Sequence, residues 1–136
     1  LLALKNTFIL YLNRYHDFSR HYAASKDADI HHIVAICCYK EPVDLIARSV
    51  ESIANQTEVH RINMIVSFEE RTPDKEMKCQ YLKEKFGQCG FQRLIFTIHP
   101  YGVPEEIPGK CSNSNYGLRK GVEEIGIRDD EMDRYL

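Results

Sequence analysis

The chain has 136 residues, of which 43% are hydrophobic, and this is enough apolar material for one core in a soluble globular domain. Its 18 basic and 20 acidic residues give a formal net charge of -2 and form no long run of one sign, which argues against DNA or RNA as partners. Five cysteines without any CxxC pair indicate reduced thiols rather than a disulfide framework or a zinc site.

Residues 1–30 are predicted to form an N-terminal helix and a linker. Apolar residues recur at helical spacing over residues 1–22, basic residues gather toward the end of that segment, and residues 23–30 are mostly polar. The apolar stretch is interrupted at Lys5 and cannot span a bilayer by itself, since a spanning helix takes about 20 mostly apolar residues. The segment therefore suits the trailing end of a membrane helix, an amphipathic helix on a membrane surface, or a solvated helix between domains.

Three apolar runs predict buried strands, at residues 33–38, 61–68 and 93–99. Pro42 ends the first run, and Asp44 is predicted to cap a helix that ends near Asn55 and Gln56. Thr72 is predicted to cap the second helix, with Pro73 in its first turn. The apolar stripe of the second helix is predicted to comprise Met77, Tyr81, Leu82 and Phe86.

Beyond the third strand, residues 100–109 hold three of the five prolines and predict an irregular loop. A further helix is expected with Ser112 or Asn113 as its cap, closing at Gly126, with Leu118, Val122 and Ile125 directed inward. Tyr135 and Leu136 resemble the opening of a fourth strand. The alternation of strand and helix predicts a Rossmann-like, three-layer α/β/α fold with a mostly parallel sheet over residues 31–136.

Three loops are expected at the carboxyl edge of this sheet, where open α/β sheets bind their ligands. They are residues 39–41, 69–71 and 99–115, and they supply an aromatic ring, carboxylates and Lys110 beside a helix start. An aromatic ring can stack on a base, carboxylates accept hydrogen bonds from base or ribose, and a lysine near helical N–H groups attracts phosphate. The edge therefore suits a nucleotide, although neither GxGxxG nor GxxxxGK[ST] is present.

Three motifs, in their order along the chain, resemble those of the inverting family 2 glycosyltransferases of GT-A type. The resemblance is nearest to the membrane-embedded chitin, hyaluronan and cellulose synthases. The motifs are Tyr39-Lys40-Glu41-Pro42, the helix end 49–56, and the segment 108–115, in which Lys110 precedes Asn115. The resemblance implies that Tyr39 and Glu41 hold the uracil and ribose of a UDP-sugar and that Lys110 meets the diphosphate. It also implies that Glu69 or Glu70 reads the uracil and that Asn115 orients Lys110 or the sugar.

The same resemblance implies that no catalytic residue and no metal ligand lies within the chain. The D-x-D that binds Mg²⁺ or Mn²⁺, and the acidic general base, are expected beyond Leu136, whereas the carboxylates of residues 129–133 are expected in a solvated turn. The parent protein would be membrane-anchored, with this domain facing the cytosol, and would transfer a sugar to a glycan or lipid acceptor. The chain alone is expected to be inactive.

Two other function classes fit parts of the pattern. One is a non-catalytic Rossmann-like binding or interaction module, in which Tyr39 closes the top of the core and Lys110 is an exposed loop lysine. The other is a small-molecule enzyme such as a methyltransferase, but that class needs a glycine-rich loop where this chain has Tyr39 to Pro42. His99 beside Pro100 could act as a base, but no paired nucleophile is evident near it, which favours a structural role.

Overall fold

The computed structural model describes residues 29–136, so the helix and most of the linker predicted for residues 1–30 lie outside the described residues. Three parallel strands form one sheet in the order β1 (His32–Cys38), β2 (Ile62–Glu69) and β3 (Arg93–His99). The helices are α3 (Val43–Ala54), α4 (Lys75–Phe86) and α5 (Lys110–Ile125), with short 3₁₀ turns at Val59–Arg61 and Asp129–Arg134. The predicted α/β class with a parallel sheet is thus confirmed, and the arrangement is compatible with a Rossmann-like fold.

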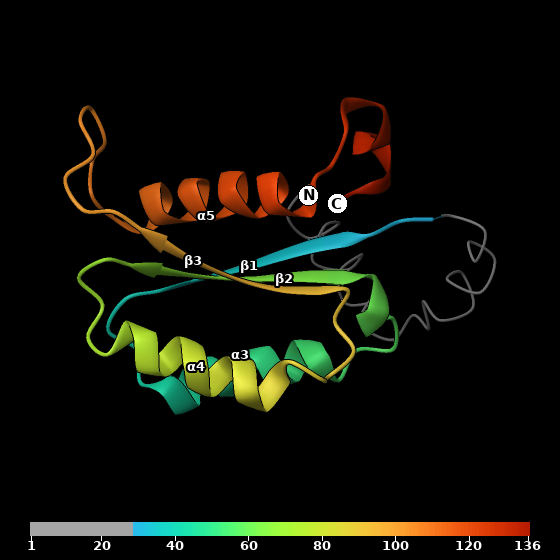
Figure 1. Ribbon diagram of the computed structural model, residues 1–136, viewed down its shortest axis with the longest axis horizontal. Coiled ribbons are helices and arrows are strands. Elements are labelled where there is room, and N and C mark those ends of the chain that lie inside the picture. The colour runs from blue at the N-terminus through green and yellow to red at the C-terminus, as the bar shows by residue number, and fades with distance from the viewer. Residues whose placement is uncertain (1–28) are drawn as a thin grey trace, which may run out of the picture.

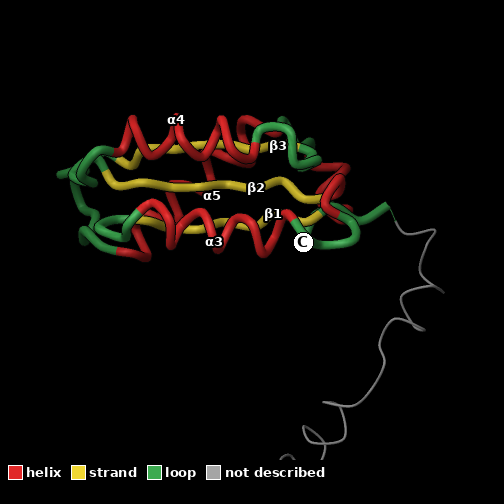
Figure 2. Tube along the Cα trace, turned by 90° about the horizontal axis from the view of Figure 1, so that it is seen from below, coloured by secondary structure: helices red, strands yellow, loops and turns green. Residues whose placement is uncertain are grey.

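Helices cover both faces of the sheet. Figure 1 shows α5 on one face and the neighbouring helices α3 and α4 on the other. Seen from the α3–α4 side, in Figure 2, the strands run in the order β1, β2, β3. All eight residues of β2 are buried, because β2 has a strand on each side and helices on both faces. β1 was expected to be buried on both faces, but only Cys38 of that strand is fully buried.

The main hydrophobic core lies between the sheet and the α3–α4 layer. Its buried members are Cys38, Ile46, Ala47, Val50, Met64, Val66, Phe68, Leu82 and Phe86. The predicted stripe on α4 was partly wrong, because Met77 and Tyr81 are exposed and only the last two predicted members face the core. Leu82 and Phe86 are four apart and lie on one side of the helix, and Cys79 of α4 packs against the same core while partly buried.

The helix starts differ from those predicted. The N-cap of α3 is Pro42 rather than Asp44, and the N-cap of α4 is Asp74 in a left-handed conformation rather than Thr72. α5 begins at Lys110 with Gly109 as its N-cap, three to four residues earlier than expected, so Asn113 is a buried residue within the helix. The earlier start places Lys110 in the first helical turn.

The face that α5 presents to the sheet is made of small residues. Its buried positions are Asn113, Gly117 and Gly121, whereas Leu118, predicted to point inward, is exposed. A Cβ at Gly117 would lie 2.7 Å from the side chain of Ser67, and one at Gly121 would lie 2.1 Å from Cδ1 of Ile65. The two glycines therefore let the backbone of α5 approach β2 closely.

Tyr135 and Leu136 pair with the free side of β1, as the predicted fourth strand requires. Tyr135 forms a parallel bridge with His31, and the N–H of Ile33 donates to the carbonyl of Leu136 at 2.7 Å. The chain thus moves from β1 to β2 and β3 in one direction and then returns over the other face to the far side of β1. The carboxyl end of β1 is consequently the point at which the strand order reverses, which in open α/β sheets is the ligand-binding crevice.

Candidate functional site

A cavity of about 250 Å³ opens at the carboxyl end of β1. It is lined from the end of β1 and its turn by Cys37, Cys38, Tyr39 and Glu41, from the end of β2 by Glu69 and Arg71, and from the start of α5 by Gly109, Lys110 and Asn113. The cavity therefore combines three segments that are distant in sequence and that parallel pairing brings to one edge of the sheet.

The turn after β1 is held by its own polar groups. The backbone N–H of Tyr39 donates to Oε2 of Glu41 at 2.6 Å, and Nζ of Lys78 donates to the Glu41 carbonyl at 3.0 Å. The Tyr39 N–H lowers the pKa of Glu41, and the nearby charges of Lys78 and Lys110 lower it further. Glu41 is therefore a carboxylate at neutral pH, with one of its oxygens already engaged by the turn.

Lys110 is the first residue of α5 and is exposed at the mouth of the cavity. The N–H groups of a helix's first turn lack partners within the helix, and they add a partial positive charge to that of the lysine. This part of the cavity suits an anionic group such as a phosphate.

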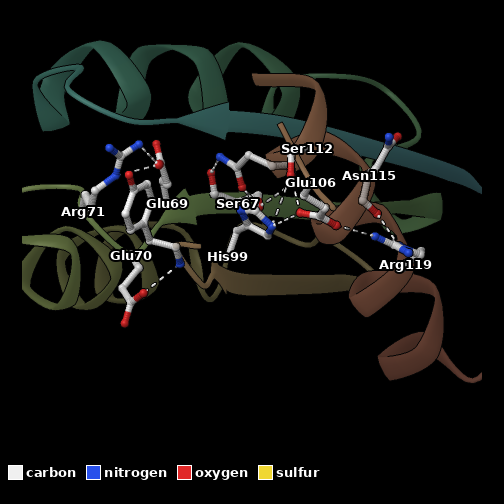
Figure 3. Close-up of polar contacts among 11 residues, drawn as sticks. Ser67, Glu69, Glu70, Arg71, His99, Glu106, Ser112, Asn115 and Arg119 are labelled. Atoms are coloured by element: carbon white, nitrogen blue, oxygen red, sulfur yellow. Dashed lines mark hydrogen bonds and ion pairs between the residues drawn. The ribbon is translucent and has the colours of Figure 1, made fainter. Parts of the chain in front are cut away.

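Glu69 and Arg71 form the opposite side of the cavity. Glu69 is the last residue of β2 and is only 8% exposed, and Nε of Arg71 donates to its Oε1 at 2.9 Å. The Arg71 guanidinium lies 3.9 Å from the centroid of the Tyr101 ring and 5.7 Å from that of Tyr39. Figure 3 shows Glu69 and Arg71 joined by their hydrogen bonds at the end of β2.

Two predicted site residues lie elsewhere. The carboxylate of Glu70 accepts a hydrogen bond from the N–H of Tyr101 at 2.7 Å, and the N–H of Glu70 donates to the carbonyl of His99, so this residue fastens two loops together. Asn115 is exposed on α5, and neither residue lines the cavity. Four of the six predicted residues, Tyr39, Glu41, Glu69 and Lys110, do line it.

Five lining residues were not predicted as site residues: Cys37, Cys38, Arg71, Gly109 and Asn113. Asn113 is 4% exposed and ties α5 to the ends of two strands: its Oδ1 accepts from Oγ of Ser67 at 2.6 Å, and its Nδ2 donates to the carbonyls of Ser67 (3.2 Å) and Cys38 (3.4 Å). The hydroxyl of Thr97 donates to that of Ser67 at 2.8 Å. Position 113 carried a sequence signal, a polar residue in an amphipathic helix, but it was interpreted as a cap.

A second polar cluster joins the 100–109 loop to α5. Oε2 of Glu106 accepts a hydrogen bond from the Ser112 hydroxyl at 2.5 Å and lies 2.9 Å from Nε2 of His99, while Arg119 approaches its other oxygen at 3.4 Å. The Ser112 hydrogen bond is the main reason that the pKa of Glu106 is lowered, and the contact with His99 adds to it. Figure 3 shows this cluster apart from the Glu69–Arg71 pair.

The geometry of this cluster is structural rather than nucleophilic. No nucleophile was evident beside His99 in the sequence, yet Oγ of Ser112 lies 3.3 Å from its Nε2. A relay needs one imidazole nitrogen toward the nucleophile and the other toward a carboxylate. Here the same nitrogen faces both groups, and the serine hydroxyl donates to Glu106. The structural role predicted for His99 agrees with this arrangement.

Within residues 29–136, no group of three or more His, Cys, Asp or Glu side chains is arranged to hold a metal ion. The same part of the chain contains no helix with the length and apolar character needed to cross a bilayer. Searches against protein-family models, curated proteins and solved structures found no match to this chain.

Proposed function

We propose that the chain is the UDP-sugar-binding part of an inverting family 2 glycosyltransferase with a GT-A type fold. The observation that carries the proposal is that Tyr39, Glu41, Glu69 and Lys110 line one cavity at the point where the strand order reverses. These residues are the ones that the family resemblance assigns to the nucleotide, and they come from three separate segments.

The chemistry of the cavity suits the parts of a UDP-sugar. The ring of Tyr39 offers a stacking face for a base, and the carboxylates of Glu41 and Glu69 accept hydrogen bonds from base or ribose. Lys110 and the first turn of α5 offer positive charge to the diphosphate. The role proposed for residues 29–136 is to bind the donor and orient its diphosphate at the sheet edge.

In the proposed parent protein, the acceptor is a glycan or a lipid, the domain faces the cytosol from a membrane, and the sugar is transferred by in-line displacement with inversion. A Mg²⁺ or Mn²⁺ ion bound elsewhere in the parent protein would stabilise the leaving diphosphate electrostatically.

Isothermal titration calorimetry with UDP tests the proposal. Lys110→Ala removes a charged partner of the diphosphate and should weaken binding on the order of tenfold, since a hydrogen bond to a charged group contributes about 1.5–3 kcal/mol. Tyr39→Ala removes the stacking face and should weaken binding to a similar extent. Lys83→Ala, an exposed lysine of α4 outside the cavity, is the matched control and should bind like the unaltered chain.

Equal affinity of the unaltered chain and both cavity variants would discard the site assignment. No measurable binding of UDP by the unaltered chain would discard the proposed function and favour a non-catalytic Rossmann-like module.

A further inference from the structure

Arg71 contacts the groups in the part of the cavity that is proposed to hold the base. Its Nε and Nη2 both donate to Oε1 of Glu69, and its guanidinium lies against the Tyr101 ring and near that of Tyr39. A planar guanidinium can stack on a ring and present two N–H groups in a rigid fork, which a lysine cannot do. One side chain thus contacts the carboxylate of β2, the turn after β1 and the 100–109 loop.

The contact with Arg71 uses only one of the two carboxylate oxygens of Glu69. Its Oε1 takes both hydrogen bonds from Arg71, and among residues 29–136 its Oε2 has no hydrogen-bond partner. Glu69 is buried and lines the cavity, so Oε2 is an acceptor available to a ligand donor. Oε2 is not among the buried side-chain atoms that lack a partner in the described part of the chain, so it is open to solvent, and a ligand N–H would take the place of water there.

Arg71 is also the cation that compensates Glu69. The other cavity cation, Lys110, is electrostatically coupled to Glu41, whereas Arg71 is bound to Glu69 directly. Without Arg71, a buried carboxylate would stand unpaired beside the place proposed for a diphosphate. The guanidinium therefore lets one cavity hold both a carboxylate acceptor and an anionic ligand.

We propose that Arg71 is a positioning residue that sets base selectivity, by holding Glu69 so that Oε2 accepts a ring N–H of the base. This inference rests on the proposed function, because it concerns the base end of the same nucleotide. It predicts that Arg71 governs discrimination between a base with that N–H and one without it, while the diphosphate end is recognised independently.

The test compares UDP with its N3-methyl derivative, in which a methyl group replaces the ring N–H. Calorimetry gives the ratio of their dissociation constants for the unaltered chain, for Arg71→Met and for Arg71→Lys. Any change in attraction for the shared diphosphate cancels in this ratio, so the ratio reports the base contact alone. Arg48→Met, an exposed arginine of α3 outside the cavity, is the matched control, and thermal melts check that each variant is folded.

The unaltered chain and Arg48→Met should bind UDP on the order of tenfold more tightly than N3-methyl-UDP, as expected for one hydrogen bond to a charged group. In Arg71→Met the ratio should fall to about one, and Arg71→Lys should not restore it, because lysine lacks the fork.

A ratio retained in folded Arg71→Met, or restored in full by Arg71→Lys, would overturn the inference while leaving the proposed function standing. If the unaltered chain binds neither ligand, the proposed function fails and the inference fails with it. If Arg71→Met does not fold, the ratio measured for Arg71→Lys decides. A ratio that falls in Arg71→Lys supports the inference, and a ratio equal to that of the unaltered chain overturns it.

Discussion

Replacing Asn113 with alanine removes the side chain that joins α5 to the carboxyl ends of β1 and β2. Three hydrogen bonds are lost, at 2.6, 3.2 and 3.4 Å. At about 1 kcal/mol for each of the two shorter bonds and about 0.5 kcal/mol for the longest, the loss is roughly 2.5 kcal/mol. Alanine is the better helix former by about 0.5 kcal/mol, so the free energy of unfolding should fall by about 2 kcal/mol.

Urea unfolding followed by circular dichroism measures this change as a shift of the midpoint at constant slope. Asn115→Ala is the matched control, because Asn115 has the same side chain, lies two positions along the same helix and is exposed. Its side chain forms no hydrogen bond with a described residue, and its backbone carbonyl, which accepts from Nε of Arg119, is kept in alanine. The control should change stability by less than about 0.5 kcal/mol. If both variants unfolded at the same urea concentration, the buried network would not be stabilising α5.

Two further predictions concern packing and pH. Gly121→Ala should destabilise the chain by up to about 2 kcal/mol, because its Cβ would lie 2.1 Å from Cδ1 of buried Ile65, and overpacking costs about 1–3 kcal/mol against a gain of about 1 kcal/mol in helix propensity. Leu118→Ala, exposed on the same helix, is the control, and an equal effect of the two would refute close packing. Glu41→Gln should be less stable than the unaltered chain near neutral pH, and equal stability there would contradict this. The pKa of Glu41 is lower in the folded chain than its ordinary 4.5, so its stabilising contribution is full above 4.5 and is lost as the pH falls through the lowered value.

Much of the fold could be predicted from the sequence because it depends on apolar runs. The three strands were predicted to within one residue at each end, since buried parallel strands are nearly continuous in apolar residues and the turns between them are polar. The loops at the carboxyl edge follow from this alternation, which is why Tyr39 and Lys110 could be assigned to one site from widely separated positions.

The packing of α5 could not be predicted in the same way. A hydrophobic pattern identifies the large apolar residue Leu118 as the buried one, but the helix instead packs through Gly117 and Gly121. Glycine contributes no hydrophobic signal, and its close approach to β2 depends on what the facing strand offers. The buried role of Asn113 could not be predicted either, because its partners Ser67 and Cys38 are distant in sequence.

The choice between Glu69 and Glu70 was also beyond the sequence. Adjacent residues at a strand end project in opposite directions, so only one of the two can enter the cavity, and the register decides which. Glu69 still pairs with His99 in the ladder and lines the cavity, whereas the side chain of Glu70 turns to the N–H of Tyr101. A pattern that notes only an acidic pair cannot separate them.

The glycine face of α5 means that, if the proposed function holds, affinity for the nucleotide is not controlled only by residues that touch it. Gly121 follows Lys110 by eleven positions, or about 16 Å along a helix with a rise of 1.5 Å per residue. The helix is close to rigid over that length, so a side chain that lifts one end from β2 changes the height of the other end above the sheet. The distances from Lys110 and the N–H groups beside it to Tyr39 and Glu41 would then change. Substitutions far from the cavity can in this way alter binding without altering any residue that lines it.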